Sequence, residues 1–131
     1  MYGLLINRLY LEEILDGRKD CDARPFPTDR RGRIALLDNK SLKVLGFADL
    51  VRVEVTDYAH YRAWQTTMRY QIPLDPLGDR RAYYLYRLRN VTRIATPLTV
   101  PTYSRDHVWV FIDDRVRRQA TVQKGIADFL S

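Results

Sequence analysis

The stretch GLLINRLYLEEILDGRKDCDAR, residues 3–24, decides how this chain begins to fold. Gly3 to Asn7 is a short apolar run that predicts a strand, and Leu9 to Asp16 predicts a short helix. The helix prediction rests on apolar residues that share one face at helical spacing, namely Leu11, Ile14 and Leu15. Gly17 is typical of a helix end, and Pro25 disfavours helical geometry in the residue before it, so residues 19–24 should run extended.

Four later segments read as strands, because they alternate apolar with polar residues or are rich in Val, Ile, Trp and Phe. The predicted strands are Arg33–Asp38, Leu42–Val55, with a bulge or bend at Gly46, Ala82–Ala95 and His107–Ile112, and a proline-containing connection spans Thr96–Asp106. Strands dominate and do not alternate with full helices, which argues against a parallel doubly wound sheet. We therefore predict an α+β fold with a curled mixed β-sheet or small β-barrel and a short N-terminal helix.

Two segments are expected to be additions to this sheet. Residues 57–80 show little regular pattern, and their length favours an irregular or helical insertion, or a lid, with a short helix near Tyr58–Gln65. Arg115–Leu130 predicts a C-terminal helix, whose apolar face either packs on the body or forms a homodimer contact. We assign residues 1–114 to the sheet domain and residues 115–131 to a helical extension.

Composition restricts the classes of site that the chain can form. The single cysteine, Cys21, excludes a disulfide within the chain and any metal site built from cysteine clusters, and it fits a reducing, cytoplasmic setting. No signal peptide and no apolar run long enough to span a membrane is apparent. The two histidines have no metal-like spacing to the acids, and there is no glycine-rich phosphate loop, so we expect no metal and no cofactor.

The net charge of +6 is unevenly distributed along the chain. Residues 1–57 hold ten basic and ten acidic residues, whereas residues 58–131 hold twelve basic and six acidic ones. Arginine supplies 18 of the 22 basic residues, and its planar guanidinium suits phosphate and stacked bases. A GC-rich coding bias would explain the arginine excess equally well. The charge asymmetry favours an anionic partner such as RNA or a nucleotide.

The segment from Gly17 to Arg24 holds the densest set of candidate functional groups. In an extended strand, Asp20, Asp22 and Arg24 would share one face, and Cys21 would point to the other. Lys19 and Arg18 lie at the preceding corner and could reach the same surface. A solvated strand with salt bridges is the alternative, and Cys21 is better explained as a small buried core residue than as a nucleophile.

The same segment resembles a known family. Leu4–Lys19 is similar to the opening of ASCH domains, which are relatives of the PUA fold, with Gly17-Arg18-Lys19 at their Gly-x-Lys position and Arg24 at a later arginine. Asp20 and Asp22 replace the threonine and glutamate that are usual there. Later matching stretches are Arg31–Asp38, Val44–Val51, Tyr84–Leu98 and Val108–Phe111, so the resemblance covers most of Leu4–Asp113. It implies a PUA-like fold with a cleft for RNA or a nucleotide beside the strand that ends at Arg24.

The resemblance also implies two alternative enzymatic activities. Some members resemble ribonucleases, for which Lys19 and Arg24 would stabilise the transition state, and Asp22 or Asp20 would act as base. Others resemble amidohydrolases of acetylated cytidine, which use a lysine matched by Lys19 and a threonine hydroxyl that is missing here. The remaining alternatives are binding without catalysis and a protein-interaction module with a basic face.

Four residues outside this segment complete the predicted ligand site. Tyr84 and Arg87 belong to a strand that interleaves aromatic and cationic side chains, which suits unstacked bases, although cross-strand packing explains them as well. His60 and Trp64 fall in the expected lid, where Trp64 could stack on a base and His60 could act as an acid or base, or simply be a surface residue.

Overall fold

A computed structural model describes residues 1–57, 59–60, 63 and 83–113 of the chain. Their secondary structure consists of seven strands and one helix. In chain order the elements are β1 (Tyr2–Ile6), α1 (Arg8–Leu15), β2 (Cys21–Arg24), β3 (Gly32–Asp38), β4 (Lys43–Thr56), β5 (Tyr83–Thr99), β6 (Thr102–Asp106) and β7 (Trp109–Ile112).

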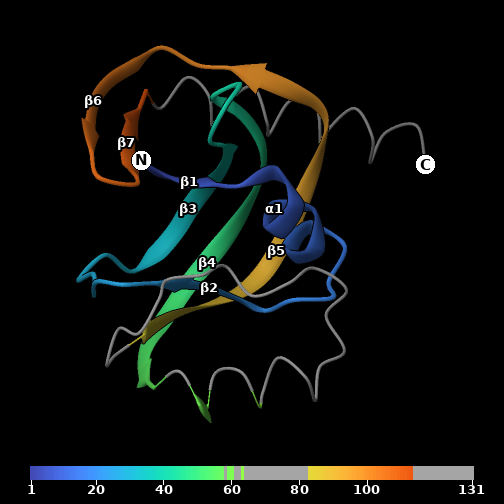
Figure 1. Cartoon of the computed structure of the whole chain (residues 1–131). Helices are drawn as coiled ribbons and strands as arrows, with labels where there is room; N and C mark the ends of the chain where they lie inside the picture. The colour runs from blue at the N-terminus through green and yellow to red at the C-terminus, as the bar shows by residue number, and fades with distance from the viewer. Residues whose placement is uncertain (58, 61–62, 64–82, 114–131) are drawn as a thin grey trace.

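The strands form one mixed sheet in the order β2-β5-β4-β3-β1-β7-β6. Strands β1 and β3 are parallel, and the other neighbouring pairs are antiparallel. The long strands β4 and β5 bend strongly, so the sheet curls around one side of the molecule (Figure 1). The predicted α+β class and curled mixed sheet are confirmed, and the sheet is open rather than a closed barrel, since β2 and β6 lie at its two ends.

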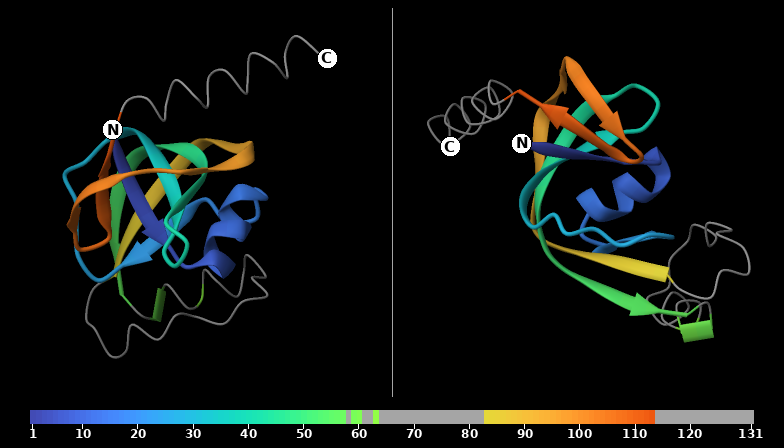
Figure 2. Two further views of the ribbon diagram at one scale, coloured as in Figure 1. Left: turned by 90° about the horizontal axis from the view of Figure 1, so that it is seen from above. Right: turned by 90° about the vertical axis from the view of Figure 1, so that its left-hand side faces the viewer.

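Helix α1 lies inside the curl of the sheet (Figure 2). Its buried Leu11 and Ile14 join the main core cluster, which also contains Leu4 and Ile6 from β1. Residues on the opposite face of the same strands form a second cluster around Leu5, Leu37 and Phe47. Strand β1 is thus buried on both faces after Tyr2, which explains its continuous apolar sequence. Each fully buried aliphatic side chain contributes roughly 1.5–3 kcal/mol relative to an exposed one.

Gly46 marks an irregularity in the long strand β4. Between Val44 and Gly46 the register shifts against both neighbouring strands: the partners change from Leu37 to Leu36 in β3 and from Leu98 to Arg93 in β5. A Cβ atom at this position would overlap the carbonyl oxygen of Thr92 and the side chain of Leu15. The predicted bulge is confirmed, and it lets α1 approach the sheet closely.

The region after residue 95 differs from the sequence-based expectation. Strand β5 continues to Thr99 through Pro97, and β6 replaces much of the predicted connection over Thr96–Asp106. The register of β4 against β5 passes from Gly46–Arg93 to Val44–Leu98, so Pro97 lies in a bulged part of β5. A proline is tolerated there because bulges release backbone N–H groups from the ladder.

Several predictions concern residues outside the described part of the chain. They are Trp64, most of the expected lid at 57–80, and the helix expected at Arg115–Leu130. The division into residues 1–114 and 115–131 and the homodimer contact remain predictions for the same reason. Among the described residues, no helix is long and apolar enough to cross a membrane.

Candidate functional site

The end of α1 determines where Lys19 lies. Gly17 adopts a positive φ of 77°, which reverses the chain as at many helix ends. The backbone N–H groups of Arg18 and Lys19 then donate to the carbonyl oxygen of Glu13 at 2.9 and 3.2 Å. These bonds fix the backbone of Lys19 against the last turn of the helix, and its side chain is buried, with only 4% of its surface exposed.

Strand β2 positions Asp22 and Arg24. It pairs antiparallel with β5, and alternation puts Asp22 and Arg24 on one face. Arg24 Nε donates to Asp22 Oδ2 at 2.5 Å, and Arg24 Nη2 donates to the carbonyl oxygen of Leu5 at 2.5 Å. The Arg24 side chain therefore connects β2 to β1, two strands that do not pair in the sheet. Asp22 is buried, with 5% of its surface exposed.

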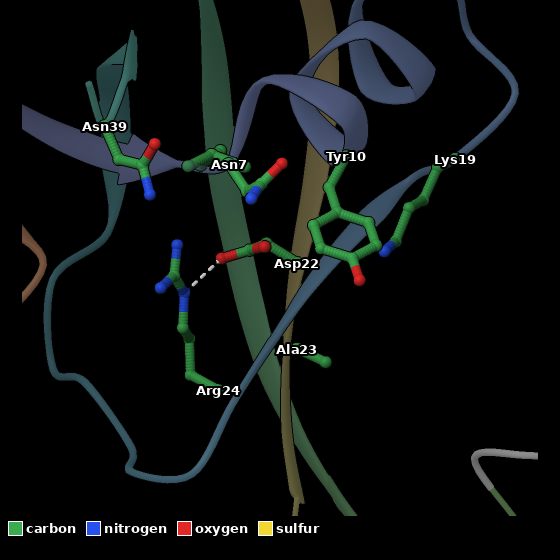
Figure 3. A pocket seen from close by; sticks show the side chains of 8 residues that line it. Asn7, Tyr10, Lys19, Asp22, Ala23, Arg24 and Asn39 are labelled. Atoms are coloured by element: carbon green, nitrogen blue, oxygen red, sulfur yellow. Dashed lines mark hydrogen bonds and ion pairs between the residues drawn. The ribbon is translucent and has the colours of Figure 1, made fainter. Parts of the chain in front are cut away.

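A cavity of about 160 Å³ lies where these elements meet. Its walls come from the end of β1, from α1, from β2 and from the turn after β3, through Ile6, Asn7, Tyr10, Lys19, Asp22, Ala23, Arg24 and Asn39. Figure 3 shows the Arg24 guanidinium directed at Asp22 and the Lys19 amino group beside the Tyr10 ring. The Lys19 nitrogen lies 4.7 Å from the centre of that ring, which is cation–π distance.

The cavity wall carries two cations, Lys19 and Arg24, and one carboxylate, Asp22. The carboxylate pairs with Arg24. Several other arginines of the described residues pair with carboxylates, as Arg24 does. These pairs are Arg8–Glu12, Arg33–Asp49, Arg52–Glu54, Arg87–Glu54 and Arg93–Glu12.

Asp20 does not share the cavity with Asp22, contrary to the alternation expected for residues 20–24. It precedes β2, its side chain is 62% exposed, and it accepts a 3.0 Å hydrogen bond from Arg87. Arg87 pairs with Cys21 in the register, which puts it on the face of β2 and β5 opposite to Asp22. The Asp20 side chain lies elsewhere than predicted because β2 begins at Cys21, one residue later than expected.

Arg87 is held in an ion-pair cluster on that opposite face. Its Nε and Nη2 atoms donate to Glu54 at 3.0 Å. Hydrogen bonds from Arg52 and from Arg87 lower the pKa of Glu54. Burial is the largest single influence on Arg87 and opposes its charge, but the hydrogen bond with Glu54 and the charges of the neighbouring acidic groups together outweigh burial and raise the pKa of the guanidinium. Both side chains are thus engaged in stabilising β4 against β5.

The other predicted ligand residues lie in three different places. Arg18 is exposed and pairs with Asp16 at 3.1 Å. Tyr84 is half-buried against the main core and faces Arg24 across the β2–β5 pair. His60 lies beside a separate, open depression with Val55 and Asp57, and its Nδ1 is 2.8 Å from an Asp57 oxygen. Of the predicted site residues, the structure brings Lys19, Asp22 and Arg24 together in one cavity.

Cys21 is fully buried on the face opposite Asp22, as predicted for a core residue. Burial raises the pKa of its thiol to about 12, although Lys19 and Arg87 act in the opposite direction. The thiol is therefore protonated at neutral pH and unsuited to nucleophilic attack.

Sequence reasoning missed three polar residues of the cavity wall, Asn7, Tyr10 and Asn39, and the two apolar ones, Ile6 and Ala23. Asn7 is the N-cap of α1 and accepts from the N–H of Leu9 at 3.0 Å, which is a common asparagine role. Tyr10 lies on the helix face that turns toward Lys19. Its position outside the apolar stripe of the helix is a sequence signal that could have marked Tyr10 as a site residue. Asn39 follows β3 in a turn, and no sequence signal links it to β2. Within the described residues, no group of three metal-ligating side chains comes together.

No protein-family model matches the chain, and no curated protein sequence does. Solved structures do match it. The crystal structure of ASCH from Zymomonas mobilis gives a TM-score of 0.68 at 15% sequence identity, covering 92% of each chain. The chain has an ASCH-like fold. Two mutants of the same ASCH protein, one with tyrosine changed to phenylalanine and one with serine changed to alanine, give TM-scores of 0.67 and 0.64 at 13% and 14% identity. The alignments cover 92% of this chain and 96% and 94% of theirs.

The likeness confirms the predicted ASCH resemblance at the level of the fold.

Proposed function

We propose that this ASCH-like domain binds RNA or a nucleotide in the cavity between β1, α1 and β2. The observation that carries the proposal is the burial of the Lys19 side chain at the wall of a cavity that also contains the Asp22–Arg24 pair. Buried lysines are rare unless a partner or a function retains them. The fold of the solved ASCH structures agrees with a PUA-like nucleic-acid module.

The size of the cavity limits the ligand to one small unit. A volume of about 160 Å³ is close to that of an engineered cavity of about 150 Å³ that holds one benzene molecule. A single base or a phosphate group fits this space, whereas a base pair does not. The ligand is therefore an unpaired nucleotide, either free or in a single-stranded region of RNA.

The lining groups offer each part of a nucleotide a suitable partner. Lys19 supplies a charge-assisted donor for phosphate. One oxygen of Asp22 is taken by Arg24, and the other can accept from an N–H group of a base edge. The amides of Asn7 and Asn39 add donors and acceptors on the far wall. Together these side chains can bind the polar edge of a base and an anionic phosphate at the same time.

Binding is tested with a labelled single-stranded RNA of eight nucleotides and with a nucleoside monophosphate. Lys19→Gln should weaken both by about tenfold or more, the effect of losing a charged hydrogen bond. Arg18→Gln is the matched control, because it removes the same charge one residue away from an exposed position. Equal losses in the two variants would assign binding to general charge and would overturn the proposed site.

Salt dependence gives a second test of the same proposal. For two to three phosphate contacts, raising the salt from 50 to 200 mM should weaken binding of single-stranded RNA roughly tenfold. The dependence should be smaller in Lys19→Gln, because that variant has lost one phosphate contact. Binding that is insensitive to salt would contradict an anionic ligand.

Hydrolysis in the same cavity is a second candidate function, favoured by the shared position of Lys19 and Asp22 on the cavity wall. Lys19 would stabilise negative charge on phosphate, and Asp22 would accept a proton. Asp20, the other candidate base, points away from the cavity and pairs with Arg87. Among the described lining residues the one hydroxyl belongs to Tyr10, so the threonine-dependent amidohydrolase chemistry has no matching group there.

Cleavage of labelled RNA by the purified protein, with and without divalent cations, separates binding from hydrolysis. A ribonuclease acting at this site should lose its activity in both Lys19→Gln and Asp22→Asn and keep it in Arg18→Gln. Activity that survives the first two changes would rule out the cavity as the catalytic site.

A further inference from the structure

Two exposed aromatic rings lie at the start of β1, at the other end of this strand from the cavity. Tyr2 in β1 pairs directly with Phe111 in β7, and their ring centres are 5.8 Å apart in an edge-to-face arrangement. Tyr2 and Phe111 are 41% and 43% exposed, although their strands are otherwise largely buried. Two adjacent exposed aromatic side chains form a surface on which another flat ring can stack.

Arg30 adds a positive charge to the same place. Its guanidinium carbon lies 3.8 Å from the centre of the Tyr2 ring and 5.3 Å from that of Trp109. Its Nε atom is buried without a hydrogen-bond partner, and no carboxylate pairs with Arg30 in the described part of the chain. The neighbouring Arg31 donates to the carbonyl oxygens of Thr28 and Arg30, not to an acid.

This lack of a carboxylate sets Arg30 apart from the arginines of β3, β4 and β5 that bind acids, such as Arg33 and Arg93. A guanidinium that stacks on aromatic rings and has no acidic partner retains its capacity to bind an anion. We call Tyr2, Arg30 and Phe111 the aromatic–arginine surface. It offers a stacking face and an anion contact side by side.

The aromatic–arginine surface and the cavity lie along the same strand. Alternation puts Tyr2, Leu4 and Ile6 on one face of β1, and Ile6 lines the cavity. Four residues at about 3.3 Å each separate Tyr2 from Ile6 by roughly 13 Å. Figure 1 shows the start of β1 beside β7 and its other end at α1. Leu4 and Ile6 are buried, so a strand that passes over the surface between the two places needs at least about four nucleotides at about 3.4 Å each.

We propose that the aromatic–arginine surface is a second subsite, which stacks one base and contacts one phosphate of a single-stranded RNA whose other end occupies the cavity. The proposal rests on the proposed function of the cavity. An apolar protein partner would cover Arg30 without neutralising it, which costs free energy. A strand of RNA supplies both an aromatic ring and an anion at the required spacing.

The test measures affinity against ligand length, using uridine monophosphate and oligouridylates of two, four, six and eight nucleotides. In the native chain, affinity should rise up to about four to six nucleotides, when the strand reaches both subsites. Phe111→Ala and Arg30→Gln should each weaken the six- and eight-nucleotide ligands by roughly 5- to 150-fold, the loss expected for one stacked base. Both should leave uridine monophosphate unaffected.

Arg52→Gln is the control for charge, because Arg52 is an exposed arginine on β4 that is paired with Glu54. Tyr2→Leu keeps the apolar packing of β1 and serves if Phe111→Ala lowers the melting temperature. The second subsite is wrong if Phe111→Ala, Arg30→Gln and Tyr2→Leu all keep the native dependence of affinity on ligand length. If Lys19→Gln weakens the binding of every ligand in the same experiment, the cavity proposal still stands.

Two further outcomes are decisive. If no ligand binds the native chain at any length, the proposed function itself fails. If an acidic peptide of eight residues competes for the aromatic–arginine surface as well as the RNA does, the surface is a protein-docking site and the RNA subsite is rejected.

Discussion

Arg24 donates one hydrogen bond to Asp22, two residues earlier on β2, and another to the backbone of Leu5 on β1. This side chain therefore joins two strands that the sheet leaves unpaired. The Asp22 carboxylate neutralises the guanidinium that makes this connection. The same pair forms one wall of the cavity, so the groups proposed to bind ligand also hold the cavity together.

Asp22→Asn should destabilise the fold, because it leaves the largely buried Arg24 cation without its counter-charge. Removing one partner of a buried pair costs about 3–5 kcal/mol, and partial exposure of Arg24 lowers our expectation to about 2–3 kcal/mol. Urea denaturation followed by circular dichroism measures the change. Asp20→Asn is the control, since Asp20 is exposed and its pair with Arg87 should contribute less than about 1 kcal/mol. Similar losses for the two variants would contradict a structural role specific to Asp22.

Gly46→Ala should also destabilise the fold, for a steric reason. The added Cβ would overlap the Thr92 carbonyl and push Leu15 of α1 away from the sheet. Overpacking of this kind costs about 1–3 kcal/mol, and backbone atoms relax less easily than side-chain ends. The melting temperature measures the effect. Gly3→Ala is the matched comparison, because its Cβ would meet the ends of the Leu37 and Ile112 side chains, so a smaller loss is expected.

Much of the fold could be predicted because each element carries its own local signal. The apolar run of β1, the face of Leu11 and Ile14, and Gly17 fix the first strand, the helix and its end within one residue. The strand that continues through Pro97 could not be predicted, since the bulge that tolerates this proline depends on the register against β4. Register is a property of the assembled sheet, not of the local sequence.

The candidate site likewise combines residues that the local sequence predicts with residues that it does not. Lys19, Asp22 and Arg24 could be chosen from a short stretch, because strand alternation is local. Asp20 was misplaced, since the first residue of a strand is the least certain one. Asn39 and Tyr10 reach the cavity through packing between elements, and no spacing in the sequence encodes that contact.

Acid should weaken the fold through carboxylates that bind arginine. A hydrogen bond from Arg93 lowers the pKa of Glu12 below its ordinary value of 4.5. A carboxylate whose folded-state pKa is lowered contributes stability above its unfolded-state pKa, and that contribution is lost as the pH falls through the folded-state value. Arg93→Gln should therefore lower the melting temperature by a few degrees at most at pH 7, because exposed pairs contribute about 1 kcal/mol or less.

The difference between native chain and Arg93→Gln should shrink as the pH falls from 5 to 3, since Glu12 becomes protonated in both. Melting temperatures measured at steps of half a pH unit follow this convergence. A difference that stays constant down to pH 3 would mean that Arg93 stabilises the fold by packing rather than through its ion pairs with Glu12 and Asp16.

Cys21 should resist alkylation in the folded chain. Its thiol is fully buried, and burial raises its pKa to about 12, so the reactive thiolate is scarce at pH 8. Iodoacetamide labelling, followed by mass spectrometry, should show almost no modification at pH 8 in buffer and complete modification in denaturing urea. Asp22→Asn tests the link to the cavity wall, because loosening β2 should speed labelling of Cys21 in buffer while Asp20→Asn leaves it slow. Rapid labelling of the native chain would show that β2 opens readily, and the cavity that depends on β2 would then not be a preformed binding site.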